Sequence, residues 1–200
     1  MATKIGVFNA ALGLLGITSL ASPTDDNEVG RTLRSHWEAA SDAAFEAGIW
    51  NFATERVELA RLSAVPTFGY AYYYQLPADY QRLGFITETG RENDPLLGYK
   101  EEKGRIATDA ERVFISYVSN LARVAVGNWS QAFADYVSAE LANRAAPKIA
   151  IDQVDKMPKV LKDAKSNALN IDAVVQPPQF RRPGRFIRAV MRGSRNQEFG

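Results

Sequence analysis

The chain has 200 residues, 46% of them hydrophobic, a length that supports one substantial core rather than two full-sized domains. It contains no cysteine, which excludes disulfides, thiolate zinc sites and thiol catalysis. The formal net charge of +1 conceals an asymmetry, because residues 177–200 hold six arginines and one acid, whereas residues 1–176 hold 18 basic and 22 acidic residues. Such a split suggests a basic arm that meets a phosphate backbone, an acidic protein surface, or nothing at all.

The first segment, residues 4–21, is KIGVFNAALGLLGITSLA. It imitates a secretory signal, but Asn9 and three glycines dilute the apolar run, and it is too short and interrupted for a membrane span. We predict a helix buried on most sides that ends at Gly16. Its two apolar stripes are Ile5, Phe8, Leu12 and Leu15, and Val7, Ala11 and Leu14.

A second helix follows a loop over residues 17–27. Asp25 and Glu28 stand at the spacing of a capping box, and Gly48 is a plausible end. One apolar stripe is expected to face the core. Its members are Val29, Leu33, Trp37, Ala40 and Ala44.

Between Trp50 and Val118 the apolar pattern changes from helical spacing to alternation. The segment FGYAYYYQLPADYQRL, residues 68–83, contains five tyrosines, and side chains alternate between the two faces of a strand. Pro77 ends this strand, the following Ala-Asp turns the chain, and residues 80–86 are expected to return as its partner. The side chains expected on one face are Phe68, Tyr70, Tyr72, Tyr74 and Leu76.

Two further β elements are predicted before the chain returns to helical spacing. Residues 97–107 suggest a hairpin in which Gly104 supplies a positive φ. Residues 113–118, VFISYV, are apolar on both faces, which favours a central strand.

The last two helices are marked by their start signals. Asn128 and Gln131 have capping-box spacing ahead of a helix, and Pro158 suits the first turn of another. The expected inward residues are Trp129, Phe133, Val137, Leu141 and Ala145 in the first, and Val160, Leu161, Ala164, Ala168 and Ile171 in the second.

These elements predict an α+β fold. Residues 1–50 and 119–176 would form a four-helix body, and residues 51–118 a β-rich insertion of antiparallel hairpins between helices 2 and 3. Residues 177–200 would form an extended, basic C-terminal arm.

Motifs for catalysis or cofactor binding are scarce. No phosphate-binding glycine loop of either common kind occurs, and the single histidine, His36, is best explained as a residue on the flank of a helix. The adjacent acids Glu101–Glu102 and Asp25–Asp26 are typical of turns and caps. We therefore predict no catalytic, cofactor or metal site.

The tyrosine-rich face allows three interpretations. It could be sheet core or inter-subunit packing, a flat contact surface for another protein, or a stacking platform for nucleic acid or sugar. A platform normally interleaves cations with its rings, and Arg82 is the only cation in residues 62–90.

Several segments, in order and at compatible spacing over about residues 5–175, resemble the tail tubular protein A family, the head-to-tail adaptors of tailed phages. The most specific are W-N-F-A at residues 50–53 and Y-x-Y-x-L-P-A-D-Y at residues 72–80. The others are ALGLLGITSLAS, GRIATD, VFISYV and WSQAFADYVSAELANRAAPKIA.

The resemblance implies a dodecameric ring at the head-to-tail junction of the virion, beneath the portal protein and above a tail or nozzle protein, which conducts DNA without sequence specificity. Such an adaptor ring needs no enzyme activity, no cofactor and no membrane. Tyr70, Tyr72, Tyr74 and Tyr80 would then form an inter-subunit or tail-facing surface. The arm would dock on the portal through Arg181, Arg182, Arg185, Phe186, Ile187, Arg188, Arg192 and Arg195.

Two other functions stay open at this stage. The arginine-rich arm could bind nucleic acid directly, or the protein could be a tail-associated cell-wall hydrolase.

Overall fold

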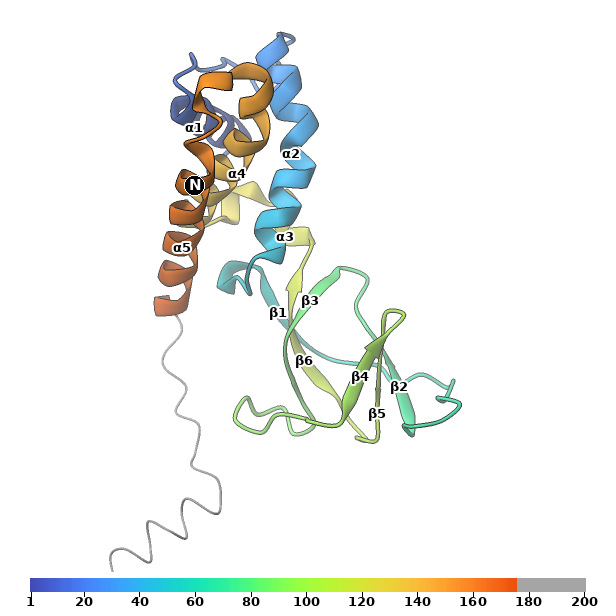
Figure 1. The fold of residues 1–200 in the computed structure, drawn as a ribbon. Helices are drawn as coiled ribbons and strands as arrows, with labels where there is room; N and C mark the ends of the chain where they lie inside the picture. The colour runs from blue at the N-terminus through green and yellow to red at the C-terminus, as the bar shows by residue number, and fades with distance from the viewer. Residues whose placement is uncertain (176–200) are drawn as a thin grey trace, which may run out of the picture.

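A computed structural model describes residues 1–175 and confirms the α+β class (Figure 1). Within these residues lie five α-helices and two small antiparallel sheets, and the β-rich segment lies between α2 and α3 as expected. The fifth helix, beyond the four predicted, is the single turn α3. The elements in chain order are α1 (Lys4–Leu15), α2 (Glu28–Glu46), η1 (Asn51–Ala53), β1 (Thr54–Glu58), β2 (Tyr72–Gln75), β3 (Tyr80–Thr87), β4 (Tyr99–Glu102), β5 (Arg105–Thr108), β6 (Phe114–Ser119), α3 (Leu121–Val124), η2 (Val126–Asn128), α4 (Gln131–Ile149), η3 (Ile151–Gln153) and α5 (Met157–Val175).

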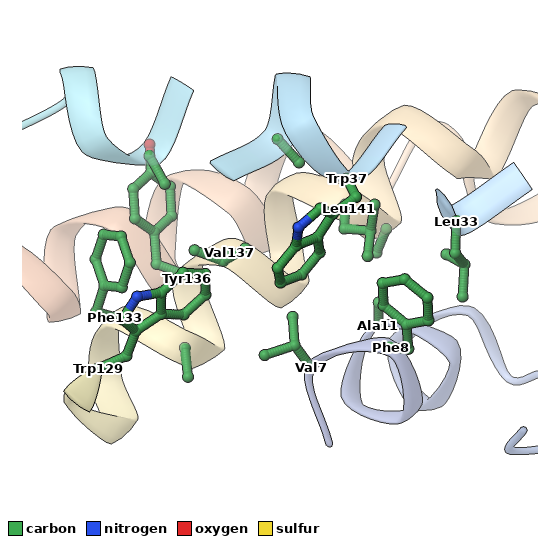
Figure 2. Packing of buried hydrophobic residues seen from close by; sticks show 14 of the residues in the cluster. Val7, Phe8, Ala11, Leu33, Trp37, Trp129, Phe133, Tyr136, Val137 and Leu141 are labelled. Carbon is green, nitrogen blue, oxygen red and sulfur yellow. The ribbon is translucent and has the colours of Figure 1, made fainter. Parts of the chain in front are cut away.

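The four long helices form what we call the helical body, and α4 lies at its centre against α1, α2 and α5. All five residues of the predicted α4 stripe are buried, as are four of the five in α2. Figure 2 shows the side chains of α1, α2 and α4 meeting around Trp37, Val137 and Leu141. The Phe133 ring lies 4.9 Å from Phe45 and 4.8 Å from Trp50, between centroids. Burial of these apolar faces is the main force that assembles the helices.

The helix boundaries are set by side-chain caps that differ by a few residues from those predicted. Asn27, not Asp25, caps α2 by accepting a hydrogen bond from Gly30 N at 2.7 Å. Asp25 instead accepts from the backbone N–H groups of Ala21 and Ser22 and so orders the loop. Ser130, not Asn128, caps α4. Several polar residues precede each helix, and the sequence alone does not fix which of them adopts the extended cap conformation.

The end of α5 is the part of the helical body that departs from the predicted burial. Pro158 is the second residue of the helix, as its first-turn preference indicates, and Ala168 is buried. Ile171, which we expected to face inward, is 46% exposed. The neighbouring Asp172 points inward instead. It accepts hydrogen bonds from Asn51, where the helical body meets the β-rich segment.

The strands form two three-stranded sheets, ordered β1-β6-β3 and β2-β5-β4, which together we call the β-rich unit. As its two apolar faces predict, β6 is a central strand. The β4–β5 hairpin is also confirmed, and its turn places Lys103 at φ 48° and Gly104 at φ 72°. Two successive positive φ values match a type I′ turn, whose twist suits a two-residue hairpin.

The predicted hairpin between the tyrosine-rich strand and residues 80–86 is wrong. β2 pairs with β5, whereas β3 pairs with β6 in the other sheet. The Pro77-to-Asp79 corner moves the chain between sheets, and Asp79 holds the new position because its carboxylate accepts hydrogen bonds from the hydroxyls of Tyr117 and Ser119. A turn sequence predicts a change of direction but not the strand to which the chain returns.

The two sheets are joined by residues 59–62, which leave β1 and run along the free edge of β2. Leu59 N donates to Val113 O, and Leu62 N donates to Tyr73 O, both at 2.8 Å. The unit is therefore a barrel that is closed on the β1–β2 side and open between β3 and β4. Its core contains Leu59, Tyr74, Leu76, Ile86, Ile106, Ala110, Val113, Ile115 and Tyr117.

Polar contacts tie the β-rich unit to the helical body. Arg82 of β3 donates to Glu46 O at 2.7 Å. Asn51 donates through its backbone N–H to the Asp172 carboxylate, and through Nδ2 to Asp172 O at 2.7 Å. Burial raises the pKa of Asp172, against the lowering effect of the bond from Asn51.

Candidate interaction surfaces

The tyrosine-rich face predicted as a contact surface is largely internal. Tyr74 is 1% exposed, and its hydroxyl donates to Ala110 O at 2.7 Å inside the β-rich core. Tyr72, on the same face of β2, packs against this core, and the Arg61 guanidinium lies 4.0 Å from its ring centroid. The prediction that Tyr74 belongs to a contact surface is therefore wrong. Strand alternation placed Tyr74 on the correct face of β2, but the second sheet covers that face. Tyr70 lies half-buried outside the strands.

Tyr80 and Tyr73 lie nearer the surface and bond to acids of the hairpin. The Tyr80 hydroxyl donates to Glu101 Oε2, and the Tyr73 hydroxyl donates to Glu102 Oε1, both at 2.7 Å. Burial and then the bond to Glu101 raise the pKa of Tyr80. The hydroxyl bond to Glu102 is the first cause of the raised pKa of Tyr73. These polar tips tie strands together, a role that residue type alone does not distinguish from a contact surface.

The adjacent acids noted in the sequence have structural partners. Glu101 and Glu102 accept from the two tyrosines, and the bond from Tyr73 is the first cause of the lowered pKa of Glu102. Asp25 orders its loop, and Asp26 pairs with Arg31 at 2.8 Å. His36 lies half-buried on the flank of α2. Within residues 1–175 no group of three His, Asp or Glu side chains could hold a metal ion.

A cavity of about 620 Å³ lies at the opening of the barrel. It is lined by β3 over residues 80–86, by residues 95–97 and by Tyr99 and Glu101 of β4. Gln81 Oε1 is buried beside it and has no hydrogen-bond partner among the described residues. No local sequence pattern predicts this cavity, since it depends on which strands pair; Gly84, inside an expected strand, is the signal that the sequence offers.

A second hollow, of about 650 Å³, separates the end of α5 from β1, β3 and β6. Leu169, Asp172 and Ala173 line its helical side, and Gly84 and Phe85 of β3 line both this hollow and the barrel opening. A smaller hollow of about 220 Å³ continues over β1 and β6. The end of α5 thus faces a depression that leads to the outer edge of β3.

Several large apolar side chains that are exposed on the described residues lie at four places. On the β-rich unit they lie in the loops before β2 and β4, and on the helical body on α3 and at the end of α5. Isolated exposed apolar residues are ordinary, but paired ones on short elements favour contact surfaces. The exposed fractions are 88% for Phe68, 89% for Leu97, 60% for Leu121, 74% for Val124, 84% for Val174 and 70% for Val175.

The predicted portal-docking residues Arg181, Arg182, Arg185, Phe186, Ile187, Arg188, Arg192 and Arg195 all lie outside the described residues. Across residues 1–175 no helix combines the length and apolar character needed to cross a bilayer.

Comparison with protein-family models gives no match for this chain, and comparison with curated proteins gives none either. The adaptor family suggested by the sequence motifs therefore stays a prediction.

Proposed function

We propose that this protein is the head-to-tail adaptor of a tailed phage, a ring-forming virion component that lies between the portal and the tail or nozzle and lets DNA pass through. One observation carries the proposal: a helical body bears a β-rich unit inserted between α2 and α3, and the motif segments of the adaptor family fall on the elements of both. W-N-F-A forms the junction at η1, and Y-x-Y-x-L-P-A-D-Y forms β2 and the corner after it.

The exposed apolar residues of the helical body support assembly with other copies. Leu121 and Val124 lie on α3, and Val174 and Val175 lie at the end of α5. Figure 1 shows α3 and α5 on different flanks of the body. Two different apolar patches on one chain suit a head-to-tail contact between copies, which closes into a ring when the rotation allows.

The arm supplies the contact with the portal in this proposal. Its six arginines favour charge-assisted hydrogen bonds with acidic groups, while Phe186 and Ile187 are apolar anchors. Residues 1–176, with 18 basic and 22 acidic side chains, have the opposite net charge of −4.

Electron microscopy of the purified protein mixed with its portal tests the proposal. A new ring layer on the portal is the expected result, and bare portals at saturating protein would contradict it. A chain truncated after Val175 is the matched variant, because it keeps all the buried core residues found in residues 1–175, the last of which is Ala168. We expect this variant to keep its circular dichroism spectrum and to lose portal binding; equal binding would remove the arm from the docking surface.

Direct binding of nucleic acid by the arm is a second candidate function, favoured by the six arginines in 24 residues. It predicts a steep loss of DNA affinity with salt, with up to about six phosphate contacts released. Absence of a gel shift at physiological salt would exclude it.

No observation on the described residues favours the cell-wall hydrolase, because the adjacent acids already have structural partners. A turbidity assay on peptidoglycan, repeated with carboxylate variants, tests that function separately.

A further inference from the structure

The barrel of the β-rich unit is not closed between β3 and β4, which are not paired with each other. β3 is hydrogen-bonded along one edge to β6, and β4 along one edge to β5, so the other edge of each strand faces the opening. Among the described residues, one backbone hydrogen bond crosses it, from Leu96 N to Ile86 O at 3.0 Å. Elsewhere the Tyr80–Glu101 side-chain bond spans it. Unpaired backbone N–H and C=O groups on two facing edges are a template for an added strand.

The inner wall of the opening is irregular where it is least paired. The β3–β6 register shifts twice, between Tyr80 and Arg82 and between Leu83 and Phe85. Such bulges are common beside binding sites because they redirect a side chain. The residue skipped in the first shift is Gln81, whose buried Oε1 has no partner among the described residues. A buried acceptor without a donor is costly, so a backbone N–H placed in this cavity would remove that cost.

We propose that residues 186–191 of the chain's own arm, FIRAVM, bind in this opening as an added strand between β3 and β4. The position of the arm favours this occupant. Val175 ends α5, and the last turns of α5 line the hollow that shares Gly84 and Phe85 with the opening. Ten residues, 176–185, separate α5 from the segment and reach about 35 Å when fully extended, and the two hollows adjoin because they share lining residues.

The composition of the segment also fits the site. Residues 186–191 are rich in residues that favour strands, and Gly184 and Gly193 lie on either side. In this arrangement Arg185 and Arg188 would bring positive charge to a cavity whose lining includes Glu101. Backbone pairing supplies affinity, and the charge and apolar side chains select this segment over an unrelated strand.

This binding takes place within one chain and does not require a portal. Where the chain is also an adaptor, the same six residues have two alternative binding sites, so portal docking must first withdraw them from the barrel. The arm would then be held back in the free protein and released on the portal, which is a form of assembly control.

Amide hydrogen exchange on the full chain tests the proposal without portal. The variant Ala189→Pro removes a backbone N–H in the middle of the segment and prevents regular strand pairing, whereas Ser194→Pro makes the same kind of change outside it. Within residues 1–175 the buried members of the two cores end at residue 168, well before both positions, and the circular dichroism spectrum of each variant checks that the body stays folded. We expect amides of residues 80–84 and 99–102 to exchange roughly tenfold faster or more in Ala189→Pro, and at the native rate in Ser194→Pro.

Equal exchange in the native chain and in Ala189→Pro would overturn the proposal, because the opening would then be empty or filled by something else. Protection that falls when the protein is diluted would also overturn it, since the occupant would be the arm of a second copy. Protection independent of dilution and lost only in Ala189→Pro supports it. None of these results depends on portal binding, so failure here is distinguishable from failure of the adaptor proposal.

Discussion

The helical body and the β-rich unit are held together by different chemistry. All three tryptophans, Trp37, Trp50 and Trp129, are buried in the helical body, where they pack against phenylalanine rings. Seven of the eight tyrosines lie between residues 70 and 117 in the β-rich unit. There the hydroxyls of Tyr73, Tyr74, Tyr80 and Tyr117 each donate to a carboxylate or backbone oxygen.

This difference shows how two small cores in one chain reach stability by separate routes. Helices bury continuous apolar stripes, so the helical body relies on apolar burial. Short strands of four to eight residues bury less, and the β-rich unit adds tyrosine hydroxyl bonds. The same difference provides two spectroscopic probes, since tryptophan emission reports on the helical body and tyrosine absorbance mainly on the β-rich unit.

The largest expected effect is at the centre of the helical body. Phe133→Ala removes a fully buried ring that contacts Phe45, Phe52 and Trp129, and we expect a loss of about 3–5 kcal/mol in the free energy of unfolding. Urea unfolding followed by tryptophan emission measures it. Phe68→Ala is the matched control, because that ring is 88% exposed and its loss should change stability by about 0.5 kcal/mol or less. Similar losses for both would show that the ring cluster does not hold the body.

A somewhat smaller loss is expected from the β-rich core. Ile106→Ala empties a fully buried site and should cost about 2–4 kcal/mol. If the two regions unfold together, the tryptophan and tyrosine probes will shift to the same urea midpoint. If only the tyrosine signal shifts, the β-rich unit unfolds as a separate cooperative unit, and the two regions then differ in unfolding free energy as well as in chemistry.

Alkaline pH should weaken the β-rich unit more than the helical body. Burial, followed by the hydrogen bond to Asp79, raises the pKa of Tyr117 from 10.0 to about 12. The folded chain thus holds this proton more tightly than the unfolded chain, and the contribution is complete below pH 10 and lost as the pH rises from 10 to 12. One pKa unit corresponds to about 1.4 kcal/mol, so Tyr117 accounts for a loss of about 2–3 kcal/mol over this range.

The variant Tyr117→Phe should flatten this pH dependence, as measured by urea midpoints at pH 9 to 12 and compared with Tyr70→Phe, whose ring lies outside the strands. An unchanged slope in Tyr117→Phe would mean that the alkaline loss arises elsewhere.

The smallest effect is expected at the junction between the two regions. Asn51→Ala removes the side-chain hydrogen bond to Asp172 O and should cost about 1 kcal/mol. The substitution should also weaken the coupling between the unfolding of the two regions. The urea midpoints of the tryptophan and tyrosine signals should then lie further apart than in the native chain. Asn93→Ala, at an exposed loop position, serves as the control and should leave both midpoints in place. Coincident midpoints in Asn51→Ala would show that other contacts couple the regions.

Sequence patterns predicted the helical body better than the β-rich unit, for a physical reason. The α4 stripe and the Gly16 stop depend on neighbours three or four residues away, and both are confirmed, with Gly16 at φ 72°. The Gly104 hairpin is equally local and is confirmed. The partner of β2 depends on residues about 30 positions away, and the local pattern left sheet core as one of three interpretations of the face that carries Tyr72 and Tyr74.

The same limit applies to the candidate surfaces. The opening between β3 and β4 exists because the corner at Asp79 directs β3 to pair with β6. A local sequence pattern does not indicate which strand edge stays unpaired. The prediction that Ile171 faces inward was wrong for a related reason. The apolar spacing of α5 continues to Ile171, but Ile171 itself is exposed.

The first and last strands of the β-rich unit pair with each other, with Thr54 opposite Val118. The insertion therefore leaves and rejoins the helical body at neighbouring points, about one strand spacing (~5 Å) apart. A short loop could bridge these points, so the whole module could be excised, or replaced by a graft of different shape, without altering the path of the surrounding helices. Such an arrangement lets the β-rich unit vary in size and shape while the scaffold beneath it stays constant.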